Sequence, residues 1–107
     1  MRLFIYALLF IFFIACKKNE STQTITTCDP TISYKNKVKA IFVANCTSSG
    51  CHDGNPLPSL ADYLTAHDAA LQIKSAVSTG VMPKNATLAP LDKAAIICWL
   101  ENGAQNN

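Results

Sequence analysis

An unbroken apolar run from Leu3 to Ile14 is the feature that most limits what this chain can fold into. Arg2 precedes the run, and the small residue Ala15 follows it. A basic start, about a dozen apolar residues and a small residue at the end are typical of a secretory signal. We prefer this interpretation to an uncleaved membrane anchor, because a membrane-spanning helix needs roughly 20 apolar residues. Residues 1–15 are therefore predicted to be removed on export to an oxidising compartment.

The residues at the predicted cleavage site resemble a bacterial lipobox. Phe13-Ile14-Ala15-Cys16 follows its pattern, with Phe13 in place of the usual leucine. The resemblance implies that Cys16 is acylated and anchors the protein to a membrane on the periplasmic side. Because no aspartate follows Cys16, the same resemblance favours the outer membrane. Residues 16–27 are then the lipidated cysteine and a flexible, polar tether.

The remaining residues, 28–107, are predicted to form one domain. Six lysines balance six acidic residues in it, so nothing in its charge favours binding to nucleic acid. Lys35, Lys37 and Lys39 lie close together, and we interpret them as a solvated helix face. A domain of this size has a marginal core, and small exported domains are usually stabilised by disulfides or a cofactor. The four cysteines of the domain are suited to either purpose.

Three segments have helical periodicity and none alternates convincingly as a strand, so the predicted fold class is all-α. The helices are expected to begin after Ser33, Thr65 and Asp92 and to end at Asn45, Gly80 and Gly103. The predicted buried faces are Tyr34, Val38, Ile41 and Phe42 on the first helix and Ala66, Ala70, Ile73 and Val77 on the second. The third helix is apolar almost all round, and we expect it to be covered on several sides.

Two long loops, residues 46–61 and 80–91, separate these helices, and loops of such length in a small domain usually have a function. The first begins with Cys46-Thr47-Ser48-Ser49-Gly50-Cys51-His52. A cysteine followed at once by histidine, with another cysteine a few residues upstream, is how c-type haem is attached. Two thiols add to the two vinyl groups of one porphyrin, while the adjacent imidazole reaches the iron. The spacer here has four residues instead of the common two, which changes only the loop that bridges the vinyl groups.

Two other interpretations of this motif remain open at the level of sequence. Cys46 and Cys51 suit a simple disulfide that closes a short loop, with His52 incidental. The three residues also suit a zinc site, for which Cys98 or His67 would have to supply a further ligand.

The order of features around the motif resembles the small soluble cytochromes c, from Tyr34 to Ala104. Pro58-Ser59-Leu60 is similar to the family's Pro-x-Leu segment, whose proline carbonyl accepts the hydrogen of the proximal imidazole. Val81-Met82-Pro83 is similar to the loop that supplies the second axial ligand. The closing helix of the family crosses the first helix, and here Phe42 and Trp99 would meet at that crossing.

The resemblance implies a small cytochrome c-like fold, with three main helices and long loops around one covalent haem c. Cys46 and Cys51 would attach the haem, His52 and Met82 would ligate its iron, and Pro58 would orient the imidazole. With both axial positions filled, the implied function is transfer of single electrons between redox protein partners. Neither catalysis nor a small-molecule substrate is expected.

Two rival functions stay open. If Met82 dissociates from the iron, the protein would be a haem-based ligand sensor or peroxidase-like protein. If no haem is attached, it would be an interaction lipoprotein held together by disulfides. His67 is the next choice as distal ligand after Met82, although we favour a solvent-facing histidine there.

The two leftover cysteines, Cys28 and Cys98, are expected to form a disulfide. Cys28 precedes the first helix, and Cys98 lies on the helix that the resemblance places across it. The compartment oxidises thiols, and haem would consume the other two cysteines. A buried free thiol at Cys98 is the alternative.

Overall fold

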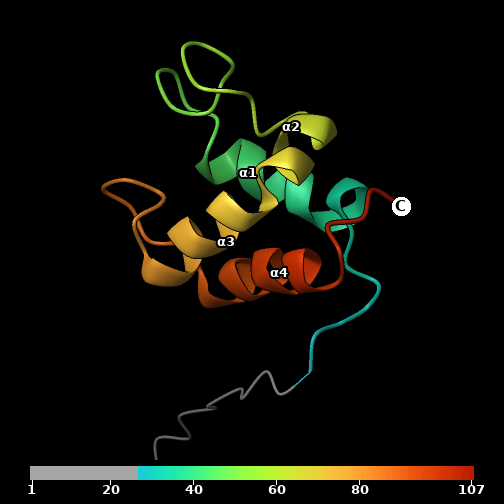
Figure 1. Ribbon diagram of the computed structural model, residues 1–107. Helices are drawn as coiled ribbons and strands as arrows, with labels where there is room; N and C mark the ends of the chain where they lie inside the picture. The colour runs from blue at the N-terminus through green and yellow to red at the C-terminus, as the bar shows by residue number, and fades with distance from the viewer. Residues whose placement is uncertain (1–26) are drawn as a thin grey trace, which may run out of the picture.

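The computed structural model describes residues 27–107, so the predicted signal, Cys16 and nearly all of the tether lie outside the described residues. Regular structure within this part of the chain is entirely helical, which confirms the all-α prediction. The elements are η1 (Tyr34–Val38), α1 (Lys39–Asn45), α2 (Tyr63–Asp68), α3 (Ala70–Thr79) and α4 (Pro90–Glu101) (Figure 1). No helix among residues 27–107 has the length and apolar character needed to cross a membrane.

The first predicted helix is present with its expected ends, formed by η1 and α1 in direct succession. Ser33 caps it: its hydroxyl accepts a hydrogen bond from the Asn36 N–H, and the Asn36 side chain accepts one from the Ser33 N–H. The first turn is wider than an α-helical turn, since the Val38 N–H reaches back to the Ser33 carbonyl. The buried face is the predicted one, Tyr34, Val38, Ile41 and Phe42, and the three neighbouring lysines are exposed.

The second predicted helix begins earlier than expected and is interrupted. Its N-cap is Asp62, not Thr65, because the Asp62 carboxylate accepts hydrogen bonds from both the N–H and the hydroxyl of Thr65, each at 3.0 Å. The helix is interrupted at Ala69, whose backbone (φ −90°, ψ 11°) separates α2 from α3. Gly80 ends α3 as predicted, with φ at +77° in the left-handed region that glycine adopts without strain.

Helix α4 starts at Pro90, earlier than the predicted start after Asp92. Proline suits this first position because its φ is fixed near the helical value. An N–H group at this position would have no partner within the helix, so its absence costs nothing. Asp92 instead lies in the first turn, where the helix dipole favours a negative charge. The helix is covered on more than one side, and its buried residues are Ala95, Ile96, Cys98 and Trp99.

These elements form a helical body, made of η1, α1, α3 and α4, in which α4 packs against α3 and η1. Trp99 is fully buried, and its indole N–H donates to the Gln105 carbonyl at 2.8 Å. Its ring meets Phe42 edge to face, with centroids 6.0 Å apart, and Tyr34 at 5.8 Å. The expected contact of Phe42 with Trp99, between the first and last helices, is therefore present.

A disulfide joins Cys28 to Cys98 across 70 residues of sequence. The prediction of this pair is confirmed, and the alternative of a buried free thiol at Cys98 is wrong. The bond ties the segment that precedes η1 to the closing helix α4. Two loops project from the body (Figure 1): the cysteine–histidine loop, residues 46–62, and the methionine loop, residues 80–89.

Candidate haem-binding site

A cavity of about 440 Å³ lies where the helical body meets the two loops. This volume is within the range of ligand sites, roughly 300–1,000 Å³. Five buried or nearly buried apolar side chains line it: Phe42, Leu60, Ile73, Val77 and Leu88. The cavity therefore has an apolar wall to which α1, α3 and both loops contribute.

All the haem-binding residues expected from the sequence line this one cavity: Cys46, Cys51, His52, Pro58 and Met82. They come from both loops, so residues 36 positions apart in the sequence are brought to one place by the fold. Sequence reasoning did not find the polar residues that share the lining, such as Gln72 on α3 and Lys84 on the methionine loop. Neither stands in a motif, and only the packing of their elements reveals them.

The four-residue spacer of the motif is folded into a compact turn. The Cys51 N–H donates to the Ser48 carbonyl at 2.9 Å, and the His52 N–H donates to the Cys46 carbonyl at 3.0 Å. The chain thus returns to Cys46 directly after the second cysteine. This turn is the physical reason that a spacer longer than two residues still keeps both cysteines and the histidine beside one cavity.

Asp53 stabilises the same turn from outside. Its carboxylate accepts hydrogen bonds from the N–H groups of Gly50 (3.2 Å) and Asn55 (3.1 Å). Both hydrogen bonds lower the pKa of Asp53 below its ordinary value, and the one from the Asn55 N–H has the larger effect. Gly50 has φ at +78°, a conformation that makes glycine the fitting residue at this point of the turn.

Both cysteines of the motif carry free thiols. Burial raises the pKa of the half-buried Cys46 thiol, and the neighbouring Cys51 raises it further. Cys46 is therefore a neutral thiol at neutral pH. The disulfide interpretation of the motif requires these two sulfurs to be bonded, which they are not in this structure.

The zinc interpretation lacks its further ligand. Cys98 is bonded to Cys28, and His67 does not line the cavity. No group of three or more histidine, cysteine or acidic side chains within residues 27–107 is arranged to hold a metal ion. His67 is exposed, packs beside the ring of Tyr63 with centroids 5.5 Å apart, and has its Nδ1 3.4 Å from the Asp68 carboxylate. These contacts agree with a solvent-facing histidine.

The segment that contains Pro58 is connected to His52 through a main-chain hydrogen bond. The Leu60 N–H donates to the His52 carbonyl at 3.2 Å, and the Tyr34 hydroxyl donates to the Leu60 carbonyl at 2.8 Å. Among the described residues the imidazole of His52 makes no hydrogen bond to the Pro58 carbonyl, so that bond stays a prediction.

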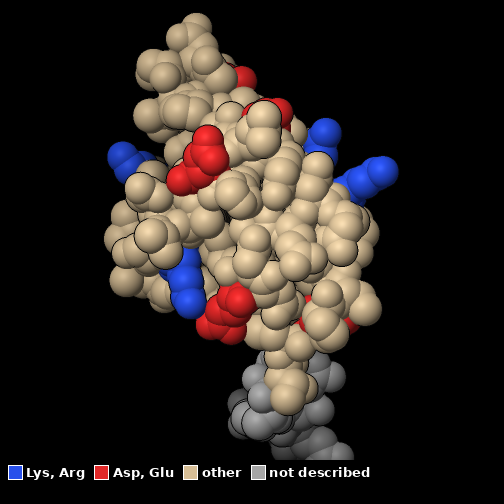
Figure 2. Space-filling view, turned by 45° about the vertical axis from the view of Figure 1, so that its right-hand side comes forward, with Lys and Arg blue, Asp and Glu red and all other residues tan. Residues whose placement is uncertain are grey.

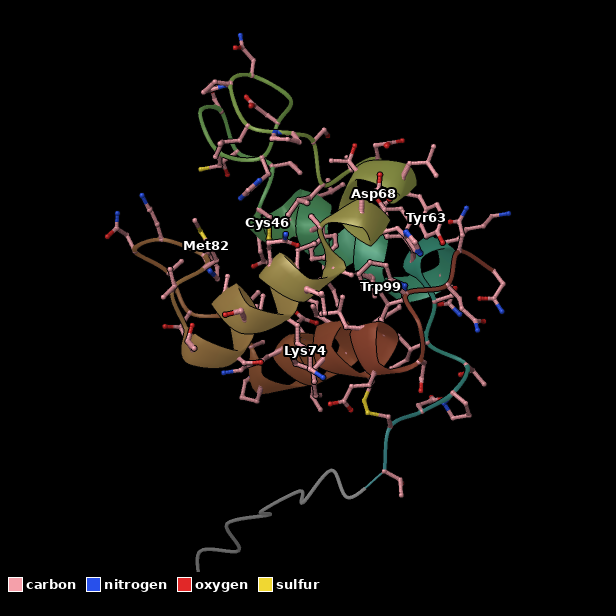
Figure 3. The ribbon with its side chains drawn as sticks, viewed as in Figure 1. Cys46, Tyr63, Asp68, Lys74, Met82 and Trp99 are labelled. Atoms are coloured by element: carbon pink, nitrogen blue, oxygen red, sulfur yellow. A yellow bond between two sulfur atoms is a disulfide. The ribbon has the colours of Figure 1, made fainter. Side chains whose placement is uncertain are left out.

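Met82, which lines the cavity, is held just beyond the end of α3. Its N–H donates to the Ala76 carbonyl at 3.2 Å, which returns the chain towards α3 after the turn at Gly80. Figure 3 shows Met82 and Cys46 on the same side of the molecule, although they come from different loops. Met82 is half-buried, so its thioether is positioned at the cavity and not sealed in the core.

The charge around the site is sparse. Lys84 is the one lysine or arginine among the lining residues, and no aspartate or glutamate lines the cavity. Figure 2 shows single lysines and acidic residues scattered over one face of the described domain, without a continuous patch of either sign. The lining therefore suits a large apolar ring system better than a phosphate or a polyanion.

Comparison of the chain with protein-family models, with curated proteins and with solved structures finds no match. The ligand of the cavity is therefore inferred from the residues that line it. Two thiols lie on one short loop, an imidazole follows the second, and a thioether comes from the other loop. This donor set, on an apolar wall, fits a covalently attached haem with histidine and methionine ligands.

Proposed function

We propose that the protein is an electron carrier with one covalently bound haem c in this cavity. The observation that supports it most is that every attachment and ligand residue expected from the motif lines one apolar cavity of about 440 Å³. The proposal includes the finer fold, a small cytochrome c-like arrangement of helices and loops around one haem.

Cys46 and Cys51 would hold the group covalently. Each thiol would add across one vinyl group of the haem, its sulfur bonding to one vinyl carbon and its hydrogen to the other, with no leaving group. This addition needs no oxidant and consumes both thiols. The turn between the cysteines presents them together, and the reduced state of both is the state that the reaction requires.

His52 and Met82 would bind the iron from the cysteine–histidine loop and the methionine loop. When bound, the haem iron accepts and releases one electron. A histidine–methionine pair raises the reduction potential relative to two histidines. The buried apolar residues of the body exclude water from the inner wall of the site, and Leu57, which also lines the cavity, is 41% exposed at its rim.

The partners in this proposal are redox proteins that approach the exposed rim, and no small-molecule substrate is involved. The lipid anchor at Cys16 belongs to the proposal as well, with an outer-membrane location on the periplasmic side. Replacing Cys16 with Ser should release the protein from the membrane fraction of the producing cells. A Cys16→Ser protein that remains fully in the membrane fraction would show that the lipoprotein assignment is wrong.

The haem assignment is tested by exporting the protein in cells that have a haem-attachment system. We expect a red protein whose haem resists extraction with acidified acetone, and a colourless product from Cys46→Ser/Cys51→Ser. The same chain exported without the attachment system is the matched control. A colourless wild-type protein under both conditions would favour the interaction lipoprotein, and rapid carbon monoxide binding by the reduced protein would favour the sensor.

A further inference from the structure

Tyr34 lies outside the haem-binding motif but is hydrogen-bonded to the segment that follows it. Its side chain is 2% exposed, and its ring packs against Phe42, Tyr63 and Trp99 with centroids 5.5 to 6.3 Å apart. Its hydroxyl donates to the Leu60 carbonyl at 2.8 Å in a buried hydrogen bond. The first turn of the helical body thus holds a residue of the cysteine–histidine loop.

Leu60 connects this hydroxyl to the predicted iron ligand. It is 6% exposed and lines the cavity, and its N–H donates to the His52 carbonyl at 3.2 Å. The His52 N–H in turn donates to the Cys46 carbonyl at 3.0 Å. Three consecutive hydrogen bonds therefore run from Tyr34 through Leu60 and His52 to Cys46.

The rest of the loop offers little other support for this position. Residues 48–51 and 53–58 are exposed, whereas Leu60 is buried. No other donor among residues 27–107 reaches the Leu60 carbonyl, and a buried carbonyl without a partner is costly. Burial, and secondarily the charge of Asp62, raises the pKa of Tyr34 to about 12, so its hydroxyl remains a donor over the whole physiological pH range.

We propose that Tyr34 is a positioning residue for His52, fixing the main chain of the proximal ligand through Leu60. This inference rests on the proposed function, because it gives His52 the role of iron ligand. Tyr34 touches neither the cavity nor His52 itself, and it acts through the two hydrogen bonds of Leu60. A fixed ligand orientation is one means by which surrounding residues tune a metal centre.

The chain contains a matched control in Tyr63. Its ring belongs to the same aromatic cluster, 5.5 Å from Tyr34, and its hydroxyl also donates to a main-chain carbonyl, that of Ala104, at 3.0 Å. Tyr63 does not line the cavity, and Ala104 lies beyond α4. Replacing either tyrosine with phenylalanine deletes one hydroxyl and one hydrogen bond while keeping the ring.

The experiment compares Tyr34→Phe and Tyr63→Phe with the wild type as reduced haem proteins. In Tyr34→Phe we expect the amide hydrogens of His52 and Leu60 to exchange about tenfold faster, since their segment opens more easily. At a fixed applied potential, the ratio of reduced to oxidised Tyr34→Phe should also change at least threefold, which is about 30 mV for a one-electron couple. Tyr63→Phe should change neither quantity.

Equal changes in both variants, or no change in Tyr34→Phe, would overturn the positioning role. Should Tyr34→Phe not fold, hydrogen exchange in the wild type decides: the Leu60 and His52 amides should open at one common rate, distinct from that of Ala104. Independent rates for Leu60 and His52 would overturn the proposal. If the wild-type protein carries no covalent haem, the proposed function is refuted instead. The exchange rates of the His52 and Leu60 amides in Tyr34→Phe and in the wild type would still show whether Tyr34 holds this segment.

Discussion

The helical body and the two loops differ in how their residues are held. The largest fully buried side chains, Trp99, Phe42, Ile96 and Val38, belong to the body, and no buried side-chain nitrogen or oxygen in the described residues lacks a hydrogen-bond partner. The cysteine–histidine loop is mostly exposed from residue 47 to 58, and a few turns and one aspartate hold its main chain. The methionine loop is similarly exposed.

The residues that stabilise this small domain and the residues expected to carry its chemistry therefore lie in different parts of it. The body supplies much of the buried apolar wall, while the predicted attachment and ligand residues come from the loops that it positions. Functional residues are often carried on loops for this reason, because a loop can be changed without disrupting the core. Changes in the body should then lower the free energy of unfolding, and changes in the loops should alter the spectrum.

The largest expected loss of stability comes from Trp99→Ala in the centre of the body. Trp99 is fully buried, contacts Phe42 and Tyr34, and donates to the Gln105 carbonyl. Removing a buried Trp side chain lowers the free energy of unfolding by about 3–5 kcal/mol. Denaturant unfolding measures the loss. Leu71→Ala is the control, because Leu71 is 81% exposed on α3 and its replacement should cost less than about 0.5 kcal/mol. Equal losses in the two variants would contradict the central place of Trp99.

The disulfide provides the next largest effect. A cross-link over 70 residues stabilises the folded chain by about 4 kcal/mol in the chain-entropy model, so Cys28→Ser should lose about that amount. The visible spectrum should be unchanged, because neither cysteine of the pair lines the cavity. In the denatured wild-type haem protein we expect no free thiol, and a count of two would contradict the pairing.

Met82→Ala should disturb the site more than the body. Met82 is half-buried, so its loss should cost less stability than Trp99→Ala. In the oxidised haem protein we expect the sulfur-to-iron charge-transfer band to disappear, the potential to fall, and added ligands to bind the iron. Val81→Ala is the matched control, since Val81 is the adjacent residue, is 62% exposed and does not line the cavity. An alanine variant at Met82 with the wild-type spectrum and potential would place the distal ligand elsewhere.

The smallest expected effect is at Asp62, where the cysteine–histidine loop meets α2. Its hydrogen bonds from the N–H and hydroxyl of Thr65 lower its pKa below the ordinary 3.8. A carboxyl whose pKa is lower in the folded than in the unfolded protein stabilises the fold above its unfolded pKa, and this contribution disappears as the pH falls through the folded value. Asp62→Asn keeps a capping side chain. Its stability should therefore depend less steeply on pH below about 3.8, measured as melting temperature against pH. A dependence as steep as that of the wild type would exclude this role for Asp62.

Features of the fold that depend only on residues close together in the sequence could be predicted from the sequence. The periodicity of Tyr34, Val38, Ile41 and Phe42 identified the buried face of the first helix, because side chains three and four positions apart share one side of a helix. Ser33 and Gly80 marked helix ends for equally local reasons: a hydroxyl that caps and a backbone without a Cβ. Cys46, Cys51 and His52, which line the cavity, also have a local signature, because they lie within seven consecutive residues.

Where two local signals competed, tertiary structure decided between them. Asp62 and Thr65 are both suitable N-caps, and α2 begins at Asp62 because its carboxylate is bonded by both donors of Thr65. The interruption at Ala69 had no local signal, since alanine favours neither a break nor a turn. The start of α4 at Pro90 was missed because the apolar pattern, which begins after Asp92, carries no information on the preceding turn.

The contacts between distant residues belong to the tertiary structure alone. The sequence by itself determined that Cys46, Cys51 and His52 form one motif and that Met82 stands in a loop. Only the tertiary structure, in which α4 packs against α3 and η1, brings Met82 to the same cavity and places the Tyr34 hydroxyl against Leu60. The physical reason is that helix periodicity and caps act over a few residues, whereas these contacts join residues 26 or more positions apart. Whether such residues meet depends on how all the helices bury their apolar faces together.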